Sequence, residues 1–184
     1  MAIITKPKIT ALARRRAAAY RQRTTTPHDG PAMLNLVLYQ PDIPQNLGAM
    51  LRLSACLGAT VHVVEPCGFP MDAAKLRRVG MDYIHKVQMV RHVNWQAFLD
   101  ARQGRPGRLL LLETDGTTCY TEMQYAPDDY VVLGSESAGT PRALYKQMDA
   151  TLTIPMREGM RSLNLAMSAG ILVAEACRQN EWRW

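Results

Sequence analysis

The sequence predicts an α/β fold in which a mostly parallel sheet is flanked by helices. Short continuous apolar runs, which are typical of strands buried on both faces, recur between residues 34 and 154. Segments with helical signals separate these runs, as they do in parallel sheets. The chain has 184 residues and is 47% hydrophobic, which is enough for one domain with a sizeable core.

The expected elements alternate along the chain. Predicted strands cover residues 34–39, 60–64, 84–90, 109–112, 130–133 and 151–154, and predicted helices cover 46–57, 72–79, 95–102, 142–148 and 162–180. Asn46 is a candidate N-cap of the first helix, and Gly58 follows its end. Ser162 occupies the N-cap position of the last helix, just before an apolar run. The acidic pair Asp128-Asp129 is most simply a solvated turn.

The net charge of +6 belongs to the N-terminal segment. Residues 1–32 contain seven lysines and arginines and one aspartate, so the remaining residues are neutral overall. We expect 1–32 to be a disordered basic extension and 33–184 to be the folded domain. Such an extension can hold nucleic acid loosely through phosphates. Alternatively, it is a leader, or it lies upstream of a natural start at Met33.

Several classes of protein are disfavoured. The four cysteines and four histidines lack the spacing of metal ligands or of a disulfide framework, so we expect no metal. No run approaches the roughly 18 apolar residues of a membrane span, and no apolar signal-peptide core is present. We therefore expect a cytoplasmic protein without a membrane partner. The sequence also lacks the glycine patterns of dinucleotide and P-loop sites.

Two loops that follow predicted strands carry polar residues that a plain connection does not need. Residues 44–52 contain Asn46 and Arg52, although an arginine by itself is more often a surface cation. Residues 134–141 contain Gly134, against which a flat ligand could lie, and Glu136 at the carboxyl edge of the sheet. The alternative for the second loop is an ordinary helix entry with Pro141 in the first position.

A third segment, 154–171, joins a strand end, a polar loop and a helix start. Ser162 and Asn164 lie near the helix start, where free backbone N–H groups and a positive dipole end are available. A strand end and a helix start together make a place for a ligand in an open α/β sheet. The alternative is an ordinary connection between a strand and a helix.

Together, in this order and spacing, the three loops resemble the three motifs of the SPOUT class of S-adenosylmethionine-dependent RNA methyltransferases. Within that class the chain resembles the tRNA 2′-O-methyltransferases that modify the wobble ribose, position 34, of cytidine or a modified uridine. The resemblance runs from Met33 to about Gln179 and includes residues 65–69 and 75–83. It departs at Ala174, where a tyrosine is common, and at Ala166, where a serine is common; the first concerns packing and the dimer contact.

The resemblance implies a deep trefoil knot near the C-terminus, S-adenosylmethionine as cofactor, the tRNA anticodon stem-loop as substrate, and a homodimer with the active site at the subunit interface. The residues implied to contact the cofactor are Leu112, Gly134, Ile154, Met156, Ser162 and Leu163. The polar residues implied to be catalytic are Asn46, Arg52, Glu136, Ser162 and Asn164.

The roles of these residues are hypotheses at this point. Arg52 is implied as the base, but a guanidinium is permanently charged. We therefore expect it to act as a base only when paired with an RNA phosphate, and otherwise to stabilise an oxyanion. Ser162 and Asn164 would orient cofactor and ribose, and Glu136 would order its loop. Candidates for phosphate contacts are Lys75, Arg77, Arg78, Arg157 and Arg161.

Two alternatives remain open. The first is the same chemistry on ribosomal RNA or at another tRNA position. The second, from a different class, is a non-catalytic RNA-binding dimer that retains the fold and lacks affinity for S-adenosylmethionine.

Overall fold

The computed structural model describes residues 34–71 and 86–182. The strands are β1 (Asn35–Tyr39), β2 (Thr60–Val64), β3 (Met89–His92), β4 (Leu109–Leu112), β5 (Thr118–Cys119), β6 (Tyr130–Leu133) and β7 (Ala150–Thr153), and the helices are α2 (Pro44–Leu57), α4 (Trp95–Arg102), α5 (Arg142–Tyr145) and α6 (Leu165–Gln179). The strands form one seven-stranded sheet in the order β3-β2-β1-β6-β4-β7-β5. All of its pairings are parallel, so the predicted sheet is confirmed.

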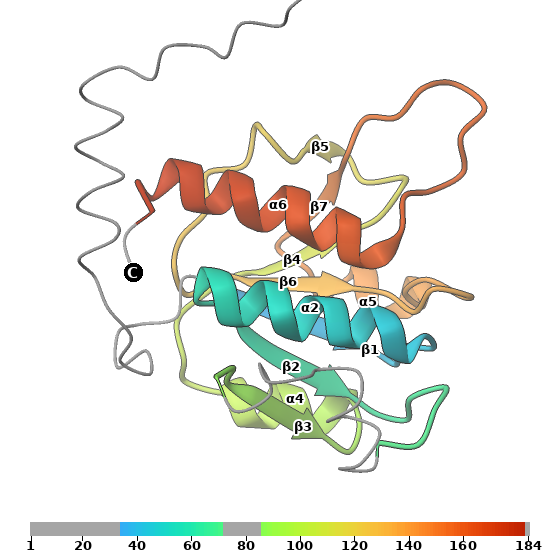
Figure 1. Ribbon diagram of the computed structural model, residues 1–184, viewed down its shortest axis with the longest axis vertical. Helices are drawn as coiled ribbons and strands as arrows, with labels where there is room; N and C mark the ends of the chain where they lie inside the picture. Colours follow the sequence, from blue (N-terminus) through green and yellow to red (C-terminus); the bar gives the residue numbers. More distant parts are fainter. Residues whose placement is uncertain (1–33, 72–85, 183–184) are drawn as a thin grey trace, which may run out of the picture.

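The two faces of the sheet are covered by different helices. Because side chains alternate along a strand, Leu36 and Leu38 of β1 face one way and Val37 the other. Leu36 and Leu38 belong to the larger core, to which α2 and α6 contribute, whereas Val37 packs with Phe98 of α4. The helices α2 and α6 lie side by side over one face (Figure 1). Continuous apolar strands therefore reflect burial on both faces.

The start of α2 differs from the prediction. The helix begins at Pro44, with Ile43 as its N-cap, and Asn46 lies inside the first turn. Proline suits the first helical position because its φ is already helical and its missing N–H would have no partner there. The predicted end is confirmed: Gly58 is the C-cap with a φ of 74°, a left-handed conformation that glycine adopts without strain.

The start of α6 also differs from the prediction. Its N-cap is Asn164, whose Oδ1 accepts hydrogen bonds from the N–H groups of Ala166 and Met167 at 3.0 and 3.2 Å. Ser162 lies two residues earlier, in the loop, and is exposed. The prediction of Ser162 as the N-cap was therefore wrong. The polar residue directly before the apolar run takes that position.

The remaining elements follow the prediction with smaller differences. The two-residue strand β5 was not predicted, because two residues give no periodic pattern, and α5 ends at Tyr145 instead of residue 148. The described third strand is Met89–His92, later than the predicted 84–90. The predicted helix 72–79 and the basic segment 1–32 lie outside the described residues. No helix in the described ranges is long and apolar enough to cross a membrane.

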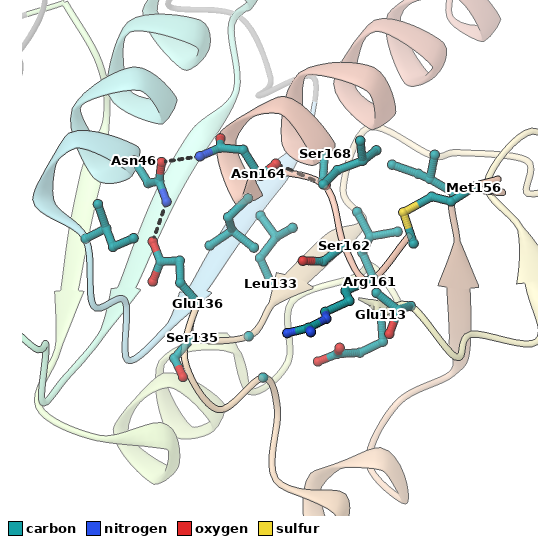
Figure 2. Close-up of a pocket in the computed structure, with 18 residues that line it drawn as sticks. Asn46, Glu113, Leu133, Ser135, Glu136, Met156, Arg161, Ser162, Asn164 and Ser168 are labelled. Atoms are coloured by element: carbon teal, nitrogen blue, oxygen red, sulfur yellow. Dashed lines mark hydrogen bonds between the residues drawn. The ribbon is translucent and has the colours of Figure 1, made fainter. Parts of the chain in front are cut away.

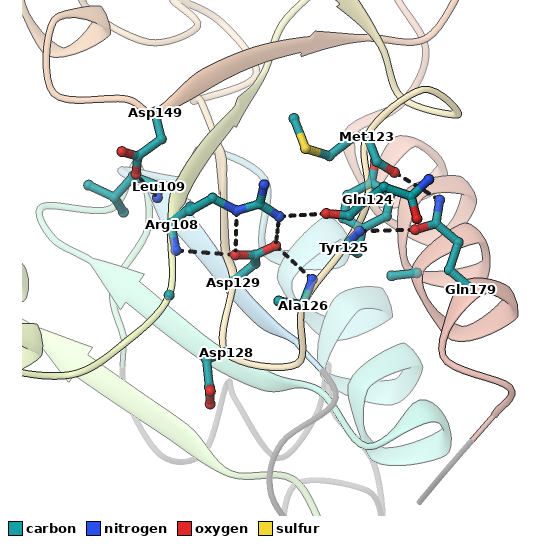
Figure 3. Close-up of polar contacts among 12 residues, drawn as sticks. Arg108, Leu109, Met123, Gln124, Tyr125, Ala126, Asp128, Asp129, Asp149 and Gln179 are labelled. Atoms are coloured by element: carbon teal, nitrogen blue, oxygen red, sulfur yellow. Dashed lines mark hydrogen bonds and ion pairs between the residues drawn. The ribbon is translucent and has the colours of Figure 1, made fainter.

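The loop before β6 is not the solvated turn that its acidic residues predicted. Asp129 is only 1% exposed, and its Oδ2 lies 2.6 Å from Nη2 of Arg108 (Figure 3). Its carboxylate also accepts hydrogen bonds from the backbone N–H groups of Arg108 and Ala126. One aspartate thus ties the loop 126–129 to the segment that enters β4.

Candidate active site

A cavity of about 440 Å³ opens at the carboxyl edge of the sheet (Figure 2). It is lined by Ile43, Asn46, Leu112, Glu113, Thr114, Leu133, Gly134, Ser135, Glu136, Gly139, Ile154, Met156, Arg161, Ser162, Leu163, Asn164, Leu165 and Ser168. The walls come from the ends of β4 and β6, the loop after β7, and the first turns of α2 and α6. Because the strands are parallel and adjacent, their carboxyl ends meet at one edge, and segments far apart in the sequence share one cavity.

A chain of three polar side chains crosses one side of this cavity. Asn164 Nδ2 donates to Asn46 Oδ1 at 2.9 Å, and Asn46 Nδ2 donates to Glu136 Oε1 at 2.7 Å (Figure 2). Asn46 is only 6% exposed, so an unpaired donor or acceptor at this position would be costly. The chain joins the first turn of α2, the loop after β6 and the start of α6.

The direction of every hydrogen bond in this chain is fixed at its two ends. At one end, helix N–H groups donate to Asn164 Oδ1, so the amide nitrogen of Asn164 must face Asn46. At the other end, the carboxylate of Glu136 can only accept, so Asn46 must present its nitrogen there. Turning over either amide would place like groups against each other, and the three side chains therefore hold one arrangement.

Glu136 also holds the loop between β1 and α2. Its Oε2 accepts from the backbone N–H of Asp42 at 2.7 Å, and Asp42 in turn accepts from the backbone N–H of Ser137 at 3.0 Å and from the Ser137 hydroxyl. Hydrogen bonds from the Ser137 side chain and backbone hold the pKa of Asp42 below its ordinary value. The loops 40–43 and 135–137 are thus joined reciprocally.

Gly134 lines the cavity, but its glycine is required for a different reason from the one expected. A Cβ at Gly134 would lie 2.5 Å from the carbonyl carbon of Gly139 and 2.6 Å from the nitrogen of Thr140. The loop folds back on itself here, with an isolated antiparallel bridge between Ser135 and Gly139. The missing side chain therefore makes room for the protein's own backbone.

Two charged groups lie on the side of the cavity away from Asn46. Glu113 is the first residue after β4, and Arg161 comes from the loop before α6 (Figure 2). Arg161 was expected only as a phosphate contact, and Glu113 was not expected at all. The sequence could have indicated Glu113, because an acidic residue directly after a buried apolar strand lies at the carboxyl edge of the sheet, as Glu136 does a few residues after its strand. Thr114, Ser135, Gly139 and Ser168 are further polar or small residues of the cavity that were not predicted.

The structure brings most of the predicted site residues together. Those that line the cavity are Asn46, Leu112, Gly134, Glu136, Ile154, Met156, Ser162, Leu163 and Asn164. Arg52 does not line it and is exposed on α2. An α-helix turns about 100° and rises about 1.5 Å per residue, so Arg52 lies about 9 Å beyond Asn46 on a different side of the helix.

The chemistry of the lining is that of an organic-ligand site. Leucine, isoleucine and methionine side chains form much of the wall, with a few carboxylate, amide and hydroxyl groups between them. About 440 Å³ falls in the usual range of small-molecule pockets, about 300–1,000 Å³. Among the described residues, no group of three or more histidine, cysteine or acidic side chains could hold a metal ion.

An open parallel α/β sheet with such a pocket at its carboxyl edge defines the class of α/β proteins that bind nucleotide-like ligands. A family model described as the SpoU rRNA methylase family matches residues 33–174. The chain therefore belongs to the SpoU rRNA methylase family.

Individual relatives and solved structures agree with this assignment. A protein of Beijerinckia indica subsp. indica named tRNA (cytidine(34)-2'-O)-methyltransferase is 48% identical over 144 residues, covering 78% of this chain and 90% of the relative. The Escherichia coli K12 protein of that name is 40% identical over 149 residues, covering 80% and 94%. A structure described as giving insights into the 2-OH methylation of C/U34 on tRNA has a TM-score of 0.77 at 41% identity, covering 84% of this chain and all of that one. The methyltransferase AviRb from Streptomyces viridochromogenes, in complex with the cofactor AdoMet, has a TM-score of 0.72 at 25% identity, covering 80% and 57%.

Proposed function

We propose that this protein transfers a methyl group from S-adenosylmethionine to the ribose 2′-hydroxyl of the tRNA wobble nucleotide, position 34, a cytidine or a modified uridine. The observation that carries the proposal is the convergence of three distant segments on one cavity, with Asn46, Glu136 and Asn164 in a fixed hydrogen-bonded chain. Relatives at 40–48% identity are named for this reaction.

The residues of the cavity fit the cofactor. We assign Leu112, Gly134, Ile154, Met156, Ser162 and Leu163 to its binding, because all of them line the cavity. Apolar side chains suit the faces of an adenine ring, and backbone groups at the loop ends can fix its polar edge. When bound, S-adenosylmethionine supplies the methyl group on a positively charged sulfur. The protein residues then have to orient the ribose and manage its proton.

We further propose that the active site is completed by a second copy of the chain, as a homodimer. Arg52 does not line the cavity of its own copy of the chain, and a two-fold axis near α2 would direct it at the partner's cavity. Large apolar residues are exposed at and next to the cavity: Ile43 (41% exposed) and Leu163 (42%) line it, and Met160 (64%) and Met167 (63%) each adjoin a lining residue in the sequence. Covering this patch in a dimer would remove it from water.

We assign the electrostatic part of the mechanism to Arg52. Its guanidinium can grip the phosphate beside the target ribose and stabilise the oxyanion that develops on the 2′-oxygen. A guanidinium stays charged, and pairing with an anionic phosphate favours that charged form further, so Arg52 acts through its charge. Ser162 borders the same cavity and is placed to orient cofactor or ribose, whereas Asn46, Glu136 and Asn164 position the loops around them.

The proposal is tested with Arg52→Ala. Methylation of position 34, measured by mass spectrometry of tRNA nucleosides, should fall about 100- to 1,000-fold, because one charge-stabilising donor is lost. Light scattering should still show a dimer, and calorimetry should still show cofactor binding. Arg178→Ala is the control, since that exposed arginine is bonded to Glu175 on α6. Near-normal turnover of Arg52→Ala would reject its role.

We also infer the finer features of the fold and the setting in which it works. A trefoil knot near the C-terminus is supported by the position of β7. This strand follows β4 and β5 in the chain but lies between them in the sheet, where it pairs with both. Residues 1–32 form a basic extension outside a methyltransferase domain of residues 33–184, and the family match beginning at residue 33 supports that boundary. The proposed substrate is the anticodon stem-loop of tRNA, and we infer a cytoplasmic enzyme because tRNA is used there.

A second substrate is favoured by one observation, because the matching family is described by ribosomal RNA methylation. Incubation with radiolabelled cofactor and either purified tRNA or ribosomal RNA separates the two, and we expect label in tRNA at position 34. A non-catalytic RNA-binding dimer would show no heat of binding with S-adenosylmethionine.

A further inference from the structure

Glu113 is a charged residue of the cavity that the proposed reaction leaves without a role. It comes directly after β4, and its backbone N–H donates to the carbonyl of Leu152 at 2.9 Å. Its side-chain Oε1 accepts from the backbone N–H of Thr140 at 2.9 Å. Both the main chain and the carboxylate are therefore anchored, and ligand binding would not have to order this side chain.

The second carboxylate oxygen of Glu113 remains available. Within the described ranges, Oε2 has no hydrogen-bond partner, and the residue lines the cavity. Gly139 lies beside it with a φ of +65°, and a Cβ there would stand 3.5–3.6 Å from the two oxygens. A glycine at this point leaves the carboxylate uncovered on that side. The cavity thus contains a fixed acceptor that is open to a ligand.

The chemistry of this acceptor selects the part of a nucleoside that it can bind. A carboxylate only accepts hydrogen bonds, so its ligand has to bring donors. The neighbouring wall is apolar, with Leu112 and Ile154, and offers a place for the base. A ribose has two adjacent hydroxyl donors, and an acidic residue after a strand binds such hydroxyls in other nucleotide-binding sheets. Arg161 shares this side of the cavity, and its positive charge offsets the negative charge of Glu113. A purely electrostatic attraction of a cation to Glu113 is therefore weakened.

We propose that Glu113 recognises the sugar of the cofactor, with Oε2 accepting hydrogen bonds from the 2′- and 3′-hydroxyls of its adenosine. This assignment rests on the proposed function, because it takes S-adenosylmethionine as the ligand. Glu113 is then a specificity-determining residue, and an adenosine without these hydroxyls is a poor ligand. The hydrogen bond to Thr140 keeps the carboxylate in the required orientation.

The test is calorimetric and needs no turnover. S-Adenosylhomocysteine and its 2′-deoxy and 3′-deoxy analogues are titrated into the full-length protein and into Glu113→Gln, and S-adenosylmethionine is titrated into the same two proteins. A charge-assisted hydrogen bond to a hydroxyl should make the wild type bind at least one deoxy analogue roughly 10- to 100-fold more weakly. Glu113→Gln should bind S-adenosylhomocysteine about 10-fold more weakly and bind that deoxy analogue with unchanged affinity. Glu122→Gln, which removes an exposed carboxylate elsewhere, should behave as the wild type.

Several results would overturn the assignment. An equal loss of affinity for S-adenosylhomocysteine and both deoxy analogues in Glu113→Gln would mean that the residue only supports the loop. A loss confined to S-adenosylmethionine, with S-adenosylhomocysteine unaffected, would mean that the carboxylate faces the sulfonium charge. Unchanged affinities would give Glu113 no contact with the ligand. If the wild type binds neither cofactor nor product, the proposed function itself fails, and this outcome is distinct from the other three.

Discussion

At the scale of single residues, Asn164 has two structural tasks. Its side-chain oxygen Oδ1 caps α6, and its side-chain nitrogen Nδ2 orients Asn46 and, through it, Glu136. The sequence predicted that Asn46, Glu136 and Asn164 share one ligand site, and their places around the cavity agree with this. The hydrogen-bonded chain could not be predicted, because it depends on helix starts at Pro44 and Leu165, each displaced from the expected residue.

The two tasks of Asn164 can be separated by substitution. Asn164→Asp keeps an oxygen that caps α6 but loses the donor to Asn46, whereas Asn164→Ala loses both. We expect Asn164→Ala to unfold with a free energy about 1 kcal/mol lower than Asn164→Asp, the usual value of an N-cap. Both variants should bind S-adenosylhomocysteine more weakly. Denaturant unfolding and calorimetry measure the two effects, and equal stability of the two variants would contradict the capping role.

Asp129 makes the stability of the protein depend on pH. Burial raises the pKa of its carboxyl, but hydrogen bonds from the Arg108 side chain and from the N–H of Ala126 outweigh this and hold the pKa below its ordinary value. A carboxyl with a depressed pKa in the folded state stabilises above its unfolded pKa, and the contribution disappears as the pH falls through the folded pKa.

We therefore expect Asp129→Asn to lower the free energy of unfolding by about 2 kcal/mol at pH 7. This is less than the 3–5 kcal/mol typical of a fully buried pair, because Arg108 is partly exposed. As the pH falls below about 4, the ordinary aspartate pKa, and on through the lower pKa of the folded state, the wild type and the variant should converge. Urea unfolding at both pH values, at one protein concentration, measures the difference. A gap that persists at low pH would show that packing, and not charge, holds the loop.

At the scale of elements, the sequence was informative about strands and poor about turns. Strands β1, β2, β4 and β6 are buried along most of their length and were predicted within a residue. The short strand β5 pairs with β7 through two residues, and long-range pairing is invisible in a local pattern. The close return of the loop 134–140 was missed for the same reason, since it depends on a contact between Gly134 and Gly139.

That close return gives a prediction for Gly134→Ala. The added methyl group would lie under 3 Å from backbone atoms of Gly139 and Thr140, so the loop must shift. We expect a loss of about 1–3 kcal/mol in stability, the usual cost of overpacking, and weaker binding of S-adenosylhomocysteine.

Gly170→Ala on α6 is the matched control for Gly134→Ala. A Cβ there meets no atom within 4 Å, and alanine favours the helix. Thermal melts and calorimetry compare the two variants. Similar melting temperatures and affinities for Gly134→Ala and the wild type would contradict the steric reading.

At the scale of the whole molecule, the class of fold could be predicted from the sequence pattern, but the contribution of a second copy of the chain to the site could not. Apolar runs alternating with helical segments indicated a parallel sheet covered on both faces, which the structure confirms. The periodicity of a single chain carries no information on whether Arg52 acts within its own subunit. Arg52 does not line the cavity that Asn46 lines, and we propose that a neighbouring copy brings it to a cavity.

Mixed dimers test this directly. Arg52→Ala and Gly134→Ala should each have low activity alone, the first because it lacks the contact with phosphate and the second because its loop is displaced. If Arg52 acts across the interface, a mixed dimer has one intact site, and random co-assembly should recover about a quarter of wild-type activity. Nucleoside mass spectrometry on tRNA from co-expressing cells measures the recovery. An absence of recovery in verified mixed dimers would place Arg52 in its own subunit's site.

The position of β7 between β4 and β5 has a consequence for biosynthesis. While the ribosome is still extending the chain, β1, β2 and β3 are already available to pair with one another. The centre of the other half stays open until residues 150–153 emerge, and Asn164 cannot join Asn46 until its own segment follows. Because chains are made at about 5–20 residues per second, the nascent protein spends seconds with its catalytic cavity unbuilt. Newly made enzyme therefore reaches competence only after the segment that contains Asn164 has been made.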